Sequence, residues 1–412
     1  MVNEFARLVD YCPTYCVAEG ASPFYNLTGN PIIFYIFELA NFAVLAFFVM
    51  IAYRLKMLSP VSMWVWFGLC LVPLGINYIL IDPQIFGDQF IYFHETTSLK
   101  TTGESVAYLA RQKFEADGKL SGVTFGSTVL GLAPIPNFMT VTSVAFANKF
   151  FALITFLWLS RYVEQHRLLF FFILPGFIIY SSLGLRDNLV ILTSMITMIH
   201  LANSRYLLGI LFLAPLLILK IQMFLFIGIY LVGKLVFRAH KSFNGMIVLF
   251  ISALAIILVN HDLILEYLNY FRVGFVAENF AGGYAGFAGA GDASAYEESS
   301  LLGVMLAAII GLPYFLLMPL PWEWSNPFHI ATFLDATLCL YATYYIVTKY
   351  QASKNQEIIF LIGCLGIGLL TYSFLVSNVS TFTRYRFTLF LPYLFCIYYV
   401  ARRDRQSNLN LE

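Results

Sequence analysis

Long runs of apolar residues, separated by short clusters of basic residues, limit what this chain can fold into. A membrane-spanning helix needs about 20 predominantly apolar residues, or about 17 at the short end. The candidate spans, some of them short and paired, are residues 31–53, 61–81, 139–160, 168–182, 189–202, 206–219, 221–233, 245–259, 301–317, 330–347, 358–375 and 388–400. The pattern predicts an all-α, polytopic membrane protein with roughly 10–12 transmembrane helices.

Composition supports the same class of protein. Hydrophobic residues make up 60% of the 412 residues and charged residues only 11%, whereas charged residues are about 25% of a soluble domain. The net charge of +1 offers no general attraction for nucleic acid. The scattered histidines and the lack of a phosphate-binding glycine loop lead us to expect no metal and no cofactor.

Two polar segments interrupt a single polytopic domain, residues 1–412. They cover about residues 82–138 and 260–300, and we expect both to be long loops on the outer face of the membrane. In the first segment, residues 104–116 have the apolar spacing of a helix that lies on the membrane surface. Residues 121–137 are uncharged and rich in Gly and Pro, which suits a re-entrant or loop segment.

Basic residues next to the spans favour the cytoplasmic side, as at Arg54, Arg161 and Arg402. We counted the spans forward from Arg54 and backward from the C-terminal tail, changing side at each crossing. The two counts together leave a second set of cations on the outer face of the membrane, although they differ by one crossing between residues 261 and 328. That set is Arg186, Lys220, Arg272, Arg384 and Arg386. A charge at the membrane centre costs about 2.5–3.5 kcal/mol, so such residues usually face a polar cavity, where phosphate groups are natural partners.

The first polar segment also carries candidate proton-transfer groups, namely Asp88, His94 and Glu95. Transfer of a sugar to an alcohol needs a carboxylate or an imidazole near the acceptor hydroxyl. The alternative is an ordinary solvated loop, in which carboxylates are common.

The outer-face cations have alternatives of their own. Arg186 either binds a ligand or pairs with Asp187 while Asp187 or Asn188 caps the next helix. Lys220, with Gln222, interrupts a long apolar run and either binds a ligand or marks a solvated turn.

Three residues late in the chain complete the candidate site. Arg384 and Arg386 share a face only in an extended segment, so both reach one phosphate only if this stretch is not helical. Trp322 either stacks on a sugar ring or anchors the chain at the membrane interface.

This layout resembles the bacterial polysaccharide polymerases of the Wzy and EpsG type and, more loosely, GT-C glycosyltransferases. The shared features are an acidic first outer loop from Asp88 to Tyr92, an arginine before a short span at Arg186, and Arg384–Phe387 before the last span. Arg272 and Gly283 also satisfy the Arg-x10-Gly pattern of O-antigen polymerases. His200, the only histidine in the span after Arg186, lies at its far end, unlike the usual EpsG-type position.

The resemblance implies an enzyme of the bacterial inner membrane that joins polyprenyl-diphosphate-linked sugar units into surface polysaccharide, such as O-antigen or capsule. It implies membrane lipid and a chain-length regulator protein as further partners. Tyr92, Gln222 and Trp322 join the cations as expected substrate-binding residues. The alternative is a transporter or flippase for the same lipid-linked sugar, which would need no base and would have paired halves. No half-to-half symmetry is visible, which favours the enzyme.

Overall fold

The computed structural model of this chain describes residues 31–76, 88–101, 122–136, 140–240, 261–281, 298, 300–324, 327–349, 355–376 and 379–409. These described residues form fifteen α-helices, one short 3-10 helix and no β-strand, so the predicted all-α fold is confirmed. The expected span at residues 245–259 and the expected surface helix at residues 104–116 lie outside the described residues. The chain folds as two compact units, residues 1–196 with 214–221 and residues 197–213 with 222–412.

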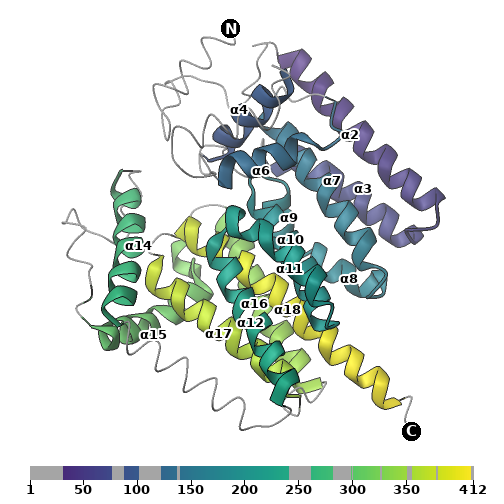
Figure 1. Cartoon of the computed structure of the whole chain (residues 1–412). Helices are drawn as coiled ribbons and strands as arrows, with labels where there is room; N and C mark the ends of the chain where they lie inside the picture. Colours follow the sequence, from purple (N-terminus) through teal and green to yellow (C-terminus); the bar gives the residue numbers. More distant parts are fainter. Residues whose placement is uncertain are drawn as a thin grey trace. The chain divides into compact units, whose positions relative to one another are not determined.

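The first unit is built around helix α7 (Val141–Leu159), which contacts most of its other helices. Figure 1 shows α7 beside its two long neighbours, α2 and α3. The other helices of this unit are α2 (Pro31–Arg54), α3 (Pro60–Gly75), α4 (Asp88–Thr101), α6 (Gly122–Gly131), α8 (Gln165–Phe172), α9 (Pro175–Ser181) and parts of α10 (Asp187–Ala202) and α11 (Tyr206–Leu219).

Polar side chains fix the start of α7 against α2. Thr140 is the N-cap of α7 and forms a capping box with Ser143. The Thr140 hydroxyl donates to the Glu38 carboxyl group, and the Asn41 amide donates to the Ser143 hydroxyl at 3.3 Å. All four residues are buried, so these hydrogen bonds offset part of the cost of burying polar groups between the two helices.

Two of the apolar runs are interrupted. The expected span at residues 168–182 is split into α8 and α9, because Pro175 disfavours a helical backbone at the residue before it and begins a new helix. The break at Lys220 was predicted and is confirmed, since α11 ends at Leu219 and α12 (Ile221–His240) begins directly after it.

The second unit packs mainly around α17 (Gln356–Leu375) and α18 (Val379–Leu409), which lie side by side in Figure 1. Helices α15 (Leu301–Leu317) and α14 (His261–Ala281) pack on α17, and α16 (Pro327–Lys349) packs on α18. A 3-10 helix, η4 (Pro321–Glu323), lies between α15 and α16.

The two polar segments contain helices within the described residues. Helices α4 and α6 lie in the first segment, and α14 occupies the early part of the second. In α4, Gln89, Tyr92, Phe93 and Thr96 are buried. This helical spacing gives the polar sequence a face that can pack, although the apolar runs alone did not reveal it.

Within the described residues, four helices are long and apolar enough to cross a membrane, namely Ile36–Arg54, Val141–Leu159, Pro327–Lys349 and Gln356–Leu375. The shorter apolar helices α3, α10, α11 and α15 and the stretch Ile221–Val236 add to these. Large apolar side chains such as Leu207 and Ile310 are exposed, at 82% and 68%. Exposed apolar faces of this kind suit contact with lipid rather than water.

Candidate functional site

Helix α4 presents two of the three candidate proton-transfer groups. Asp88 is the first residue of the helix and is exposed, and Glu95 is half-buried. Positions 88, 92 and 95 fall on one side of the helix because residues three and four apart are neighbours. Tyr92, between the two carboxylates, is buried at 1% exposure. The His94 backbone belongs to α4, but its side chain lies outside the described part of the structure.

The turn from α9 to α10, which carries Arg186, is held in place by side chains from two other helices. The Gly184 amide donates to Gln89 Oε1 of α4 at 3.0 Å. The Asn148 amide of α7 donates to the carbonyls of Leu183 and Leu185 at 2.7 and 2.9 Å. These bonds fix the backbone on both sides of Gly184, and therefore the position from which Arg186 extends.

Arg186 lies against α6, where two glycines leave room for it. A Cβ on Gly126 would lie 3.1 Å from the Arg186 Cβ, and a Cβ on Gly122 would collide with its guanidinium group. Arg186 is half-buried, and among the described residues nothing forms a hydrogen bond or an ion pair with its side chain. A positive charge in this position suits an anionic ligand, since it has donors to offer and partial shelter from water.

The carboxylate next in sequence does not compensate Arg186. Asp187, the first residue of α10, forms an ion pair with Lys220 Nζ at 3.4 Å, and both side chains are at most 5% exposed. The alternative in which Arg186 pairs with Asp187 is therefore wrong. Lys220, at the break between α11 and α12, thus neutralises the charge of Asp187. Gln222 is half-exposed at the start of α12.

The second unit contains the remaining predicted residues. Arg272 of α14 pairs with Glu298 at 3.3 Å and lies over the Phe374 ring, 4.4 Å from its centroid. Gly283, the second residue of the Arg-x10-Gly pattern, lies outside the described residues. Trp322 of η4 is 78% exposed, which is compatible with either of its expected roles.

Arg384 and Arg386 both lie within α18, which is helical across this stretch. The two side chains therefore leave the helix in nearly opposite directions, and the arrangement in which both reach one phosphate does not occur. Arg386 is buried and donates to the backbone carbonyls of Phe315, Leu316, Met318 and Thr332 at 2.9–3.1 Å. It thus supplies hydrogen-bond donors to the backbone carbonyls at the C-terminal end of α15. Arg384 is half-buried.

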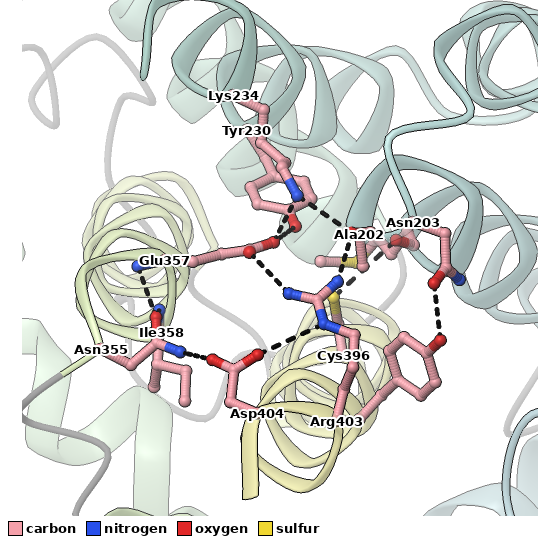
Figure 2. A network of polar contacts seen from close by, with 12 residues as sticks. Ala202, Asn203, Tyr230, Lys234, Asn355, Glu357, Ile358, Cys396, Arg403 and Asp404 are labelled. Carbon is pink, nitrogen blue, oxygen red and sulfur yellow. Dashed lines mark hydrogen bonds and ion pairs between the residues drawn. The ribbon is translucent and has the colours of Figure 1, made fainter. Parts of the chain in front are cut away.

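A second group of charges in this unit is compensated within the structure. In Figure 2, Glu357 of α17 accepts from Lys234 at 2.7 Å and from Arg403 at 3.1 Å. Arg403 also donates to the Ala202 carbonyl and to Asp404, at 2.5 and 3.3 Å. Burial acts to lower the pKa of Arg403, but the attraction of Glu357 and Asp404 outweighs it, and the pKa is raised. This network joins the ends of several helices, which indicates a structural role.

Sequence reasoning missed Gln89 and the two glycines around Arg186. The signal for the glycines was visible, because Gly122 and Gly126 have the Gly-x3-Gly spacing that allows close approach in membrane helices. Gln89 had no such signal, since its partner is a backbone amide 95 residues away. Among the described residues, no group of three or more His, Cys, Asp or Glu side chains could hold a metal ion.

The fold and its exposed apolar helices define an all-α protein suited to a membrane. No known family, curated protein or solved structure matches the chain.

Proposed function

We propose that this protein is a membrane glycosyltransferase that joins polyprenyl-diphosphate-linked sugar units during surface polysaccharide synthesis in the bacterial inner membrane. The observation that carries the proposal is the half-buried guanidinium group of Arg186, which no described residue compensates while Asp187 is engaged by Lys220. A fixed, sheltered guanidinium group is well suited to a diphosphate, since it offers paired N–H donors in a planar arrangement.

In the proposed reaction, the acceptor hydroxyl forms a bond to the anomeric carbon of the donor sugar. The bond between that carbon and the diphosphate oxygen breaks, and the diphosphate leaves with the electron pair. Arg186 stabilises the charge that develops on the leaving group. Asp88 or Glu95, on the same side of α4, takes the proton of the acceptor hydroxyl. The substrate-binding roles expected for Arg272 and Arg384 stay predictions.

The second candidate function is transport of the same lipid-linked sugar across the membrane. The observation that favours it is the pair of interrupted helices, α8 with α9 and α11 with α12. Discontinuous helices are typical of transporters, where their ends bind charged groups at the substrate site. A transporter would use Arg186 in the same way but would have no need for Asp88 or Glu95 as a base.

Purified protein in proteoliposomes, supplied with lipid-linked sugar, separates these functions. We expect polymer to form, and we expect Arg186→Ala to slow its formation by about 10- to 100-fold, the loss expected for a charged hydrogen bond. Arg186→Lys should also be slow, because lysine lacks the planar group that contacts two phosphate oxygens. Asp88→Asn or Glu95→Gln should abolish transfer without changing the amount of folded protein.

Arg161→Ala is the matched control, because Arg161 is exposed and predicted to be cytoplasmic. Wild-type transfer rates in every Arg186 variant would remove the proposed role of Arg186. Movement of lipid-linked sugar between leaflets without any polymer, and unaffected by Asp88→Asn and Glu95→Gln, would establish the transporter instead.

A further inference from the structure

A carboxyl group is buried between two helices of the first unit. Glu38 of α2 is 1% exposed, and its Oε1 atom accepts a hydrogen bond from the Thr140 hydroxyl at the start of α7. Among the described residues, nothing forms a hydrogen bond with its other oxygen, Oε2. The side chains that continue this contact are also neutral, since Thr140 Oγ1 lies 2.9 Å from the Ser143 hydroxyl, which accepts from Asn41.

No described cation pairs with this carboxyl group. Helix α2 packs mainly on α3 and α7, whose described ionisable side chains are Cys70 and Lys149. Neither of them forms a hydrogen bond or an ion pair with Glu38. Lys149 lies further along α7, and its Nζ atom donates to the Ser181 hydroxyl of α9 at 2.7 Å. The other charged residue of α2, Arg54, lies at the far end of that helix.

An ionised carboxylate would be unfavourable in this position. Burying a charge without an opposite charge costs far more than a hydrogen bond to a neutral hydroxyl contributes. A bound proton removes the charge, and it needs no cavity, because it becomes part of the carboxyl group. The Oε2 atom of Glu38 is the oxygen available to carry that proton. Ionisable residues inside membrane helices are often proton or ion sites, which agrees with this interpretation.

The first turn of α7 connects this carboxyl group with the turn that carries Arg186. Thr140, which caps α7, makes the contact with α2. Val141 and Val144, in the same turn of helix, lie against Gly184. A Cβ on Gly184 would lie 3.2 Å from the Val144 Cβ and 3.4 Å from the Val141 carbonyl oxygen. The start of α7 is therefore held by α2 and in turn supports the backbone just before Arg186.

We infer that Glu38 is a proton-binding residue, whose bound proton keeps the first turn of α7 on α2 and thereby positions the turn that carries Arg186. When the proton passes to water, the carboxylate needs water or a cation around it. Helix α2 then separates from the start of α7, and the support for Gly184 is weakened. Glu38 acts through α7 and is thus a positioning residue. The inference rests on the proposed function only where lipid binding at Arg186 serves as a readout.

Infrared difference spectra of the full chain in lipid nanodiscs test for the bound proton. At about pH 7 an exposed glutamate, with a pKa of about 4.3, is ionised. The carbonyl band of a neutral carboxyl group should nevertheless be present in the wild-type protein and lost in Glu38→Gln. Thr140→Val should shift this band to higher frequency, because the carbonyl oxygen loses its hydrogen bond. Glu164→Gln is the matched control and should leave the band unchanged, since Glu164 is exposed and pairs with Arg167 at 3.0 Å.

The pH dependence of melting in detergent provides a second readout. Native wild-type protein should bind one proton more than unfolded protein, in which Glu38 is exposed to water. The stability that this proton contributes is complete below the pH at which exposed glutamate ionises and is lost as the pH rises. Above about pH 5 the unfolding equilibrium constant of the wild type should therefore rise about tenfold per pH unit relative to Glu38→Gln, as long as Glu38 keeps its proton.

Binding of polyprenyl diphosphate in nanodiscs tests the connection with Arg186. As the pH rises through the range in which the infrared band disappears, the wild-type protein should lose about tenfold in affinity, as for one charged hydrogen bond. Glu38→Gln should keep its affinity, because glutamine cannot ionise. Ionisation of the diphosphate itself affects both proteins equally, so the ratio of their affinities reports on Glu38 alone.

Several outcomes overturn the inference. Identical infrared spectra of the wild type and Glu38→Gln, or equal pH dependence of their melting temperatures, would exclude the proton site. If Glu38→Gln does not fold, an unshifted band in Thr140→Val excludes it instead. Equal pH dependence of lipid affinity in both proteins would remove the connection with Arg186. Failure of the proposed function is distinct, since the wild type would then bind no polyprenyl diphosphate at any pH while the infrared and melting results stay as expected.

Discussion

At the scale of single residues, the position of Arg186 depends on two neighbouring glycines, which have no side chain to obstruct it. Gly122 and Gly126 bring the backbone of α6 against the arginine, which an alanine at either position would obstruct. The obstruction at Gly122 has two parts, since a Cβ there would meet the guanidinium group and would lie 2.5 Å from the Ile218 carbonyl oxygen. A side chain can rotate away, whereas a helix carbonyl cannot move without shifting its backbone.

Gly122→Ala should therefore displace Arg186 and strain the contact between α6 and α11. We expect a loss of about 1–3 kcal/mol in stability, as for other overpacked sites, together with weaker binding of polyprenyl diphosphate. Gly68→Ala in α3 is the control, because a Cβ at that position meets nothing within 4 Å. Melting temperature and lipid binding in nanodiscs measure both effects. Unchanged values in Gly122→Ala would show that α6 does not constrain the arginine.

At the scale of elements, Arg386 joins α18 to the end of α15 and to α16. Its hydrogen bonds to Phe315, Leu316 and Met318 occupy carbonyls that the helix itself leaves without partners at its end. The bond to the Thr332 carbonyl reaches α16 as well. Arg386, which the sequence analysis predicted to bind the substrate, therefore connects α18 to α15 and α16.

Arg386→Gln should destabilise the second unit by on the order of 3 kcal/mol, because buried carbonyls would lose charged donors. Arg384→Gln is the comparison, two residues away in α18 and only half-buried. It should cost less stability and, if Arg384 binds phosphate, should slow transfer in protein that is fully folded. Denaturation in detergent and the transfer assay separate the two effects. Equal stability of both variants would contradict the structural role of Arg386.

At the scale of the whole molecule, the distribution of basic residues predicts which segments face outward. Arg161 follows α7 and is expected in the cytoplasm, while α4 and η4 are expected on the other side. Asp88, Arg161 and Trp322 are all exposed, so each can report on its side of the membrane.

Single cysteines in a background without the native ones test this arrangement. A membrane-impermeant thiol reagent should label the Asp88→Cys and Trp322→Cys variants in intact cells. The Arg161→Cys variant should react only after the cells are permeabilised. Labelling of Asp88→Cys only after permeabilisation would place α4 in the cytoplasm and would remove it from an outer-face active site.

The helical class, most helix positions and the break at Lys220 could be predicted from the sequence alone. These properties depend on the length of apolar runs and on basic or helix-ending residues beside them, which are local features. The break between α8 and α9 could also have been predicted, because Pro175 lies at it. The continuous apolar character of residues 168–182 led us to expect a single span there instead.

The partners of the charged and polar groups, in contrast, follow from tertiary packing. Asp187 pairs with Lys220 rather than with the adjacent Arg186, and Gln89 binds a backbone amide 95 residues further along the chain. Such choices depend on which distant segments meet, because a buried charge or amide takes whatever partner the packing brings within reach. The helical form of α4 has the same origin, since a polar sequence becomes an ordered helix there by burying Tyr92 and Phe93 against its neighbours.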